Sequence, residues 1–150
     1  MQPDFSLMDV NPASATFNQL VSPRDYLGKT SAWYFGYSTW SYCSRQFGEL
    51  DKLHDELEAE YPALDFPIIG INKFGIGNSS SNIDISSGRD LPWLQDIDDN
   101  GNGTSDVWSD LWQVTYRDVV VLNDDNSIAE VFNLSQYNLG VDTAKDGHEL

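Results

Sequence analysis

The junction between residues 30 and 46 constrains the fold of this chain more than any other feature. Residues 30–37 form an apolar, aromatic run that ends in the small polar residues Ser38 and Thr39. A helical pattern then begins at Ser41 and ends before Pro62. Its apolar residues recur at spacings of three and four: Cys43, Phe47, Leu50, Leu53, Leu57 and Tyr61. A buried strand that leads directly into a long amphipathic helix predicts an α/β fold.

Cys43 is the only cysteine of the chain, and the pattern places it in the first turn of this helix. A helix N-terminus has unpaired backbone N–H groups and a partial positive charge, which together favour a thiolate. We expect Ser41 or Thr39 to be the N-cap. Two interpretations remain open: Cys43 is a reactive thiol, or it is a small buried residue on the apolar stripe.

The remaining segments complete an α/β order within one predicted domain, residues 1–150. Strand–helix–strand connections of this kind imply a parallel pair of strands. We expect a central mixed β-sheet flanked by helices. The predicted elements are a loosely alternating segment at 4–10, a short strand, a turn and a one-turn helix at 16–29, a buried strand at 65–72, a loop at 75–89, an apolar anchor at 91–94, a strand at 118–122 and its hairpin partner at 127–134.

The net charge and the hydropathy of the chain exclude several classes of binding partner and of membrane protein. The net charge of −16 argues against partners such as nucleic acid or an anionic membrane surface. No apolar run approaches the ~20 residues of a membrane span, and residues 1–20 lack the features of a signal peptide. We expect a soluble protein, either cytoplasmic or exported with its leader removed; its oligomeric state is left open.

Several blocks of sequence resemble the amino-terminal domain of selenoprotein P, a member of the thioredoxin-like superfamily, and bacterial redoxin-domain proteins. Trp40-Ser41-Tyr42-Cys43 stands where that domain has a selenocysteine-x-x-cysteine motif at the start of a helix. The similarity extends in blocks over residues 16–134. The other matching blocks are 44–46, 50–53, 66–72, 74–76, 106–108 and 117–122.

The resemblance implies a thioredoxin-like fold and thiol-dependent reduction of disulfide or peroxide substrates without an organic cofactor. It makes Trp40 and Cys43 the candidate catalytic positions, with the nucleophile expected at 40 and the resolving thiol at 43. Arg117 or Asp118 falls where thioredoxins carry a cis-proline that faces the redox pair. An indole cannot form a mixed disulfide. The chain is therefore a redox-inactive binding module, a monothiol protein that acts through Cys43, or a protein with selenocysteine at position 40, which shares the UGA codon with tryptophan in some decoding systems.

An acidic loop at residues 96–110 predicts a calcium site. Oxygen ligands at alternate positions converge on one cation where a glycine, here Gly103, permits a sharp bend. The sequence alternatives are a register that starts at Asp96, and a solvated turn without metal. His54 and His148 are not placed to form a metal site with Cys43. The predicted ligands are Asp98, Asn100, Asn102, the Thr104 carbonyl and Asp106.

Overall fold

A seven-stranded mixed sheet forms the centre of the computed structural model, which describes residues 1–137 and 139. The strand order is β2-β1-β5-β4-β3-β6-β7. β3 and β4 are parallel, as are β4 and β5, whereas all other neighbours are antiparallel. The strands are β1 (Leu7–Asp9), β2 (Leu20–Val21), β3 (Ser31–Gly36), β4 (Ile68–Asn72), β5 (Trp93–Gln95), β6 (Asp118–Leu122) and β7 (Ile128–Asn133).

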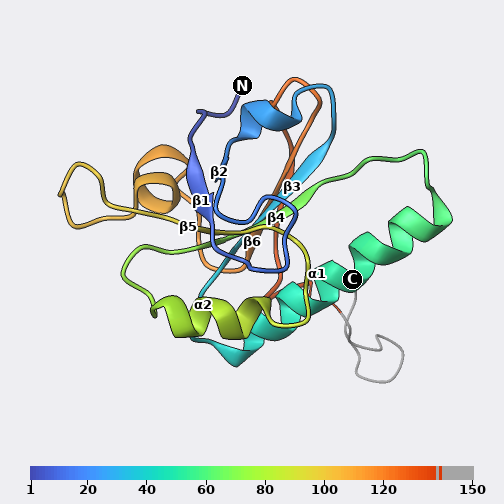
Figure 1. Ribbon diagram of the computed structural model, residues 1–150. Helices are drawn as coiled ribbons and strands as arrows, with labels where there is room; N and C mark the ends of the chain where they lie inside the picture. The colour runs from blue at the N-terminus through green and yellow to red at the C-terminus, as the bar shows by residue number, and fades with distance from the viewer. Residues whose placement is uncertain (138, 140–150) are drawn as a thin grey trace.

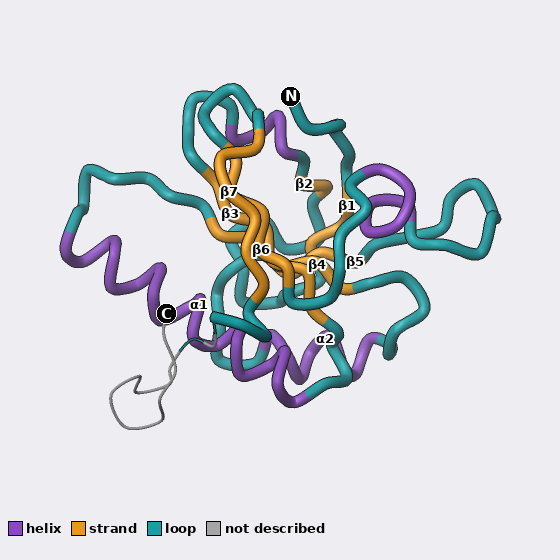
Figure 2. Tube along the Cα trace, turned by 180° about the vertical axis from the view of Figure 1, so that it is seen from behind, coloured by secondary structure: helices purple, strands orange, loops and turns teal. Residues whose placement is uncertain are grey.

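Helices cover both faces of the sheet (Figure 1). α1 (Ser41–Glu60) and α2 (Ser79–Ser86) share the core cluster on one face. The 3-10 helix η1 (Pro23–Tyr26) and the π-helix η2 (Asp106–Leu111) pack against the core cluster on the other. Figure 2 shows the same layers from behind, with β6 and β7 beside β3.

The central strand β3 joins the two cores because successive side chains of a strand point to opposite faces. Trp33 and Phe35 belong to the core that contains η2, and both are 0% exposed. Ala32 and Tyr34 belong to the core beneath α1. All six residues of β3 are buried, which explains why its sequence is continuously apolar rather than alternating.

The strand–helix–strand prediction is confirmed. β3 and β4 pair in parallel, with Ala32 opposite Ile68 and Gly36 opposite Asn72. The strand expected at 65–72 begins only at Ile68. Pro67 has no N–H to donate to the ladder, although its carbonyl accepts the N–H of Ala32. The hairpin of β6 and β7 is also confirmed.

Two segments differ from the sequence prediction. The expected loop at 75–89 contains the helix α2, and the apolar anchor at 91–94 contributes the strand β5. The Asn78 side chain accepts the N–H of Ser81, and the Ser81 hydroxyl accepts the N–H of Asn78. This reciprocal cap, together with burial of Ile85, stabilises a short helix that is too polar to be predicted from its apolar spacing.

Candidate functional site

Cys43 lies in the first turn of α1, immediately beyond the end of β3, as predicted. Its side chain is nevertheless completely enclosed, with 0% exposure. The hydroxyl of Tyr34 donates to the Cys43 carbonyl at 3.1 Å. The pKa of Tyr34 is raised well above 10, mainly by burial and secondly by the neighbouring Cys43. The position expected of a reactive thiol is therefore correct, but the environment is that of a buried core residue.

The N-cap of α1 is Trp40, not Ser41 or Thr39 as expected. No side chain caps this helix end. The hydroxyl of Ser38, in the loop before α1, is within 2.8 Å of the Ser81 hydroxyl at the start of α2. Ser38 thus links the loop before α1 to α2, and the N-cap Trp40 makes no side-chain cap hydrogen bond.

Trp40 occupies the exposed position of the motif, at 41% exposure. Its ring meets Tyr37 at a centroid distance of 4.6 Å and Tyr116 at 5.3 Å, both edge-on. Tyr37 also contacts Tyr116 at 5.6 Å and Trp108 at 5.5 Å. We call Tyr37, Trp40, Trp108 and Tyr116 the ring cluster. It brings together residues from the end of β3, the start of α1, the π-helix and the segment before β6.

Arg117 faces the motif, in the region expected for the thioredoxin cis-proline. Its guanidinium carbon lies 3.9 Å from the ring centroid of Tyr42 and 5.6 Å from that of Trp40. The backbone of Arg117 has a φ of 70°, a conformation that L residues rarely adopt. Its N–H donates to the Phe35 carbonyl at 2.5 Å, so the end of β3 holds this residue against the site.

Sequence reasoning missed the ring cluster because its members come from four separate segments. Trp40 and Tyr37 were visible at the junction, but nothing local indicated that Trp108 and Tyr116 would join them. The available signal was Tyr116, which lies just before the strand predicted at 118–122.

The acidic loop is anchored by a residue whose role the sequence did not reveal. Asp96 is 1% exposed, and its carboxylate accepts the Ser105 hydroxyl and the N–H groups of Val107 and Trp108. It therefore caps the π-helix η2 and positions Trp108 in the ring cluster. Both of its carboxylate oxygens accept hydrogen bonds from protein groups, and the calcium register beginning at Asp96 stays an alternative prediction.

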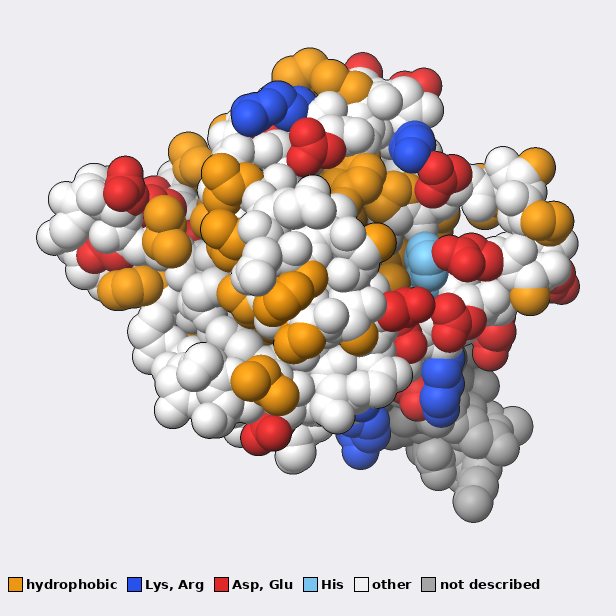
Figure 3. Space-filling model, viewed as in Figure 1, with side chains coloured by type: hydrophobic (Ala, Val, Ile, Leu, Met, Phe, Trp, Pro, Cys, Tyr) orange, Lys and Arg blue, Asp and Glu red, His pale blue; other side chains and the backbone are white. Residues whose placement is uncertain are grey.

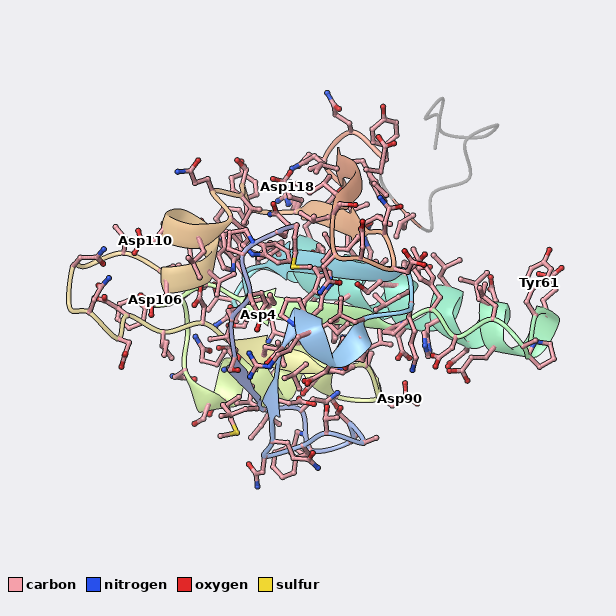
Figure 4. All side chains as sticks on the ribbon, turned by 90° about the horizontal axis from the view of Figure 1, so that it is seen from above. Asp4, Tyr61, Asp90, Asp106, Asp110 and Asp118 are labelled. Atoms are coloured by element: carbon pink, nitrogen blue, oxygen red, sulfur yellow. The ribbon has the colours of Figure 1, made fainter. Side chains whose placement is uncertain are left out.

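The predicted calcium ligands lie in a projecting loop, near the labelled Asp106 and Asp110 of Figure 4. Asp98 accepts the N–H groups of Asn102 and Gly103. Gly103 has a φ of 85°, which confirms the predicted bend. Asp106 accepts the Asp99 N–H through Oδ2, while its enclosed Oδ1 has no hydrogen-bond partner among the described residues.

Asp110, which the prediction did not include, joins the loop. Its carboxylate accepts hydrogen bonds from the Asn102 amide and the Thr104 hydroxyl, and these bonds lower the pKa of Asp110. The predicted set contains only two carboxylates. In keeping with this, residues 1–137 and 139 contain no group of three His, Cys, Asp or Glu side chains able to hold a metal ion.

His54 lies far along α1 from Cys43, with its Nδ1 3.2 Å from a Glu58 carboxylate oxygen. It lines a cavity of about 470 Å³ together with Lys29, Asp65 and Asp90. This cavity lies beside the start of β4, whereas the ring cluster lies beyond the end of β3. His148 lies outside the described residues.

No protein-family model and no curated protein matches this sequence. Solved structures do resemble its fold. The exposed lipoprotein thioredoxin of Streptococcus pneumoniae is 18% identical, with a TM-score of 0.62, and the match covers 87% of this chain and 89% of that one. The thioredoxin domain of a thiol-disulfide oxidoreductase from Bacteroides vulgatus is 14% identical, with a TM-score of 0.58, over 86% of this chain and 83% of that one.

The copper-bound ScoI of Arabidopsis thaliana also matches, at 14% identity and a TM-score of 0.65, over 97% of this chain and 94% of that one. These similarities confirm the predicted thioredoxin-like fold. The finer resemblance to selenoprotein P stays a prediction. Within the described residues, no helix has both the length and the apolarity needed to cross a membrane.

Proposed function

We propose that the protein is a thioredoxin-fold oxidoreductase of the thiol or selenol type, whose redox pair occupies positions 40 and 43. The supporting observation is the contrast between these positions. Position 40 is 41% exposed at the N-cap of α1, whereas Cys43 is 0% exposed one helical turn further on. An accessible attacking group and a sheltered resolving thiol are what a two-step thiol–disulfide exchange needs.

The chemistry requires a nucleophile at position 40. A thiolate or selenolate there attacks a substrate disulfide, forms a mixed disulfide and releases the first substrate thiolate. The Cys43 thiolate then attacks the sulfur or selenium at position 40, which closes the internal bond and releases the second substrate thiolate. The substrate gains two electrons that the pair loses, and an external dithiol restores the pair. With Trp40 in place, the first step cannot occur.

Trp40→Cys tests the proposal. We expect this variant to reduce a protein disulfide in the presence of dithiothreitol at least about tenfold faster than the parent chain. Trp40→Ser is the matched control, since it removes the indole without supplying a sulfur. A folded Trp40→Cys protein with no more activity than Trp40→Ser would contradict the proposal.

The resemblance to selenoprotein P supports selenocysteine as the natural residue at position 40. The genomic codon tests this part of the proposal separately. A UGA codon followed by a selenocysteine insertion element would support it, whereas a UGG codon would exclude it.

The second candidate function is a redox-inactive calcium-binding module on the same fold. The enclosed and unpartnered Oδ1 of Asp106 favours it, because a cation would supply the missing partner. Calcium would be bound by oxygen atoms of the five predicted residues, with the modest affinity expected for two carboxylates. Calorimetric titration with calcium, with Asp98→Asn as the impaired variant and magnesium as the competing ion, tests this candidate. No heat of binding at millimolar calcium would exclude it.

A further inference from the structure

Three of the seven described basic side chains lie at or beside the candidate site of this acidic protein. The chain has 8 Lys and Arg residues against 24 Asp and Glu, and Lys145 lies outside the described residues. Asp and Glu side chains crowd one side of the face seen in Figure 3. In contrast, the three cations Arg45, Lys73 and Arg117 all lie on aromatic rings at or beside the ring cluster.

Among the described residues, these three cations have no carboxylate partner. The described ion pairs of Lys and Arg are Arg24 with Asp4, Lys29 with Asp65 and Lys52 with Glu49. No carboxylate within residues 1–137 and 139 pairs with Arg45, Lys73 or Arg117. The Arg117 Nε is also enclosed without a hydrogen-bond acceptor among the described residues.

The contacts of these cations leave their charge uncompensated. The guanidinium groups of Arg45 and Arg117 lie 5.1 Å and 3.9 Å from the centroid of one ring, that of Tyr42. Two like charges on one side chain repel each other. A cation–π contact attracts the cation to the ring, but it does not neutralise the charge. A bound anion would relieve the repulsion.

The arrangement is too extended for a single small anion. Lys73 lies 5.9 Å from the ring centroid of Tyr37 and 5.7 Å from that of Trp108, whereas Arg45 and Arg117 lie on the ring of Tyr42. Between the cations, Trp40 and Tyr116 expose 41% and 37% of their surface. A ligand that meets all three charges must therefore carry several carboxylates and must lie across apolar rings.

We propose that this surface binds an acidic peptide segment, with the carboxylates on Arg45, Lys73 and Arg117 and the chain lying over the ring cluster. The inference deepens the proposed function, on which it rests, by naming the substrate class: proteins whose disulfide lies next to acidic residues. Selection by local charge would let an acidic protein accept acidic substrates that its net charge would otherwise repel.

The test is calorimetric binding of short blocked peptides to the unmodified chain at low salt. Three peptides of serine and glycine carry glutamate, glutamine or lysine at the same positions. We expect binding of the glutamate peptide, weakened by added NaCl, and no binding of the glutamine or lysine peptide. Trp40 is the most exposed of the five tryptophans, so its fluorescence reports whether the peptide reaches the ring cluster.

Charge variants locate the site. Arg117→Gln and Lys73→Gln should each weaken binding of the glutamate peptide by about twofold to fivefold. Lys52→Gln is the matched control, because it removes the same charge from an exposed, ion-paired lysine elsewhere on α1. We expect the control to bind as the parent does.

Equal effects of all three charge variants, or tighter binding of the lysine peptide, would overturn the inference. Complete displacement of the glutamate peptide by an equal concentration of inorganic phosphate would also overturn it, since a simple anion site would then suffice. Because the binding measurement involves no redox step, its result does not depend on the result of the Trp40→Cys assay. Binding without gained activity would contradict only the oxidoreductase, and gained activity without binding would contradict only the acidic substrate.

Discussion

At the scale of single residues, exposure rather than position decides what Cys43 can do. Cys43 lies in the first turn of α1, but a reagent cannot reach a side chain that is 0% exposed. Cys43 also lacks a second cysteine with which to form an internal disulfide. A sheltered thiol of this kind suits a resolving role and not an attacking one.

We therefore expect Cys43 to react with a thiol reagent only through opening of the structure. Its rate in the native protein should be at least about a hundredfold below that in denaturant, the factor set by an opening free energy of about 3 kcal/mol. Absorbance of the released reagent measures both rates. Ser41→Cys in a Cys43→Ser background is the control, since Ser41 is exposed in the same helical turn. Equal native rates for the two thiols would contradict the enclosed position of Cys43.

At the scale of elements, one glycine in a central strand sets how closely α1 packs on the sheet and leaves room for a ring of the neighbouring strand β5. A Cβ built on Gly70 of β4 would lie 2.3 Å from the Trp93 ring and 2.8 Å from the Phe47 ring. Both rings are 0% exposed and meet at a centroid distance of 4.8 Å. The absence of a side chain at Gly70 is thus what admits two large rings into this core.

Gly70→Ala should destabilise the protein by about 1–3 kcal/mol, because neither buried ring has room to move. Chemical denaturation monitored by circular dichroism measures the change. Gly48→Ala is the control: its Cβ would meet the Arg89 side chain, whose guanidinium can move, and alanine favours the helix α1 by up to about 1 kcal/mol. A cost for Gly48→Ala as large as that for Gly70→Ala would contradict this explanation.

At the scale of the whole molecule, the net charge of −16 is the dominant electrostatic feature. Self-repulsion destabilises the compact state of such a protein. α1 contributes to it, since its last turn carries no basic residue and ends in Glu60. An acidic side chain at a helix C-terminus also opposes the helix dipole.

Raising NaCl from low to physiological concentration should therefore raise the Tm, by about 2–4 °C, because salt screens this repulsion. Differential scanning calorimetry at fixed pH measures the shift. The double variant Glu56→Gln and Glu60→Gln should be more stable at low salt and should gain less from NaCl. A Tm that falls with NaCl, or a variant with the same salt dependence as the parent, would contradict the role of net charge.

The sequence alone determined the β3–α1–β4 unit, the β6–β7 hairpin and the place of Cys43 beyond β3. These features follow from local patterns: continuous apolar runs, helical spacing that ends at Pro62, and turn residues at 123–126. Local patterns also predicted the bend at Gly103. For the same reason they failed for α2, whose stability depends on a reciprocal cap and one buried face.

Only the tertiary structure decided how enclosed Cys43 is and what surrounds Trp40. Exposure depends on side chains contributed by distant strands, and Tyr34 and Arg117 reach the motif because the sheet places β6 beside β3. The role of Asp96 could not be predicted from the sequence either, because it also depends on contacts that form only in the folded chain. A carboxylate among acidic loop residues looks like a cation ligand in sequence, and only the packed chain shows that it binds the amides of a helix.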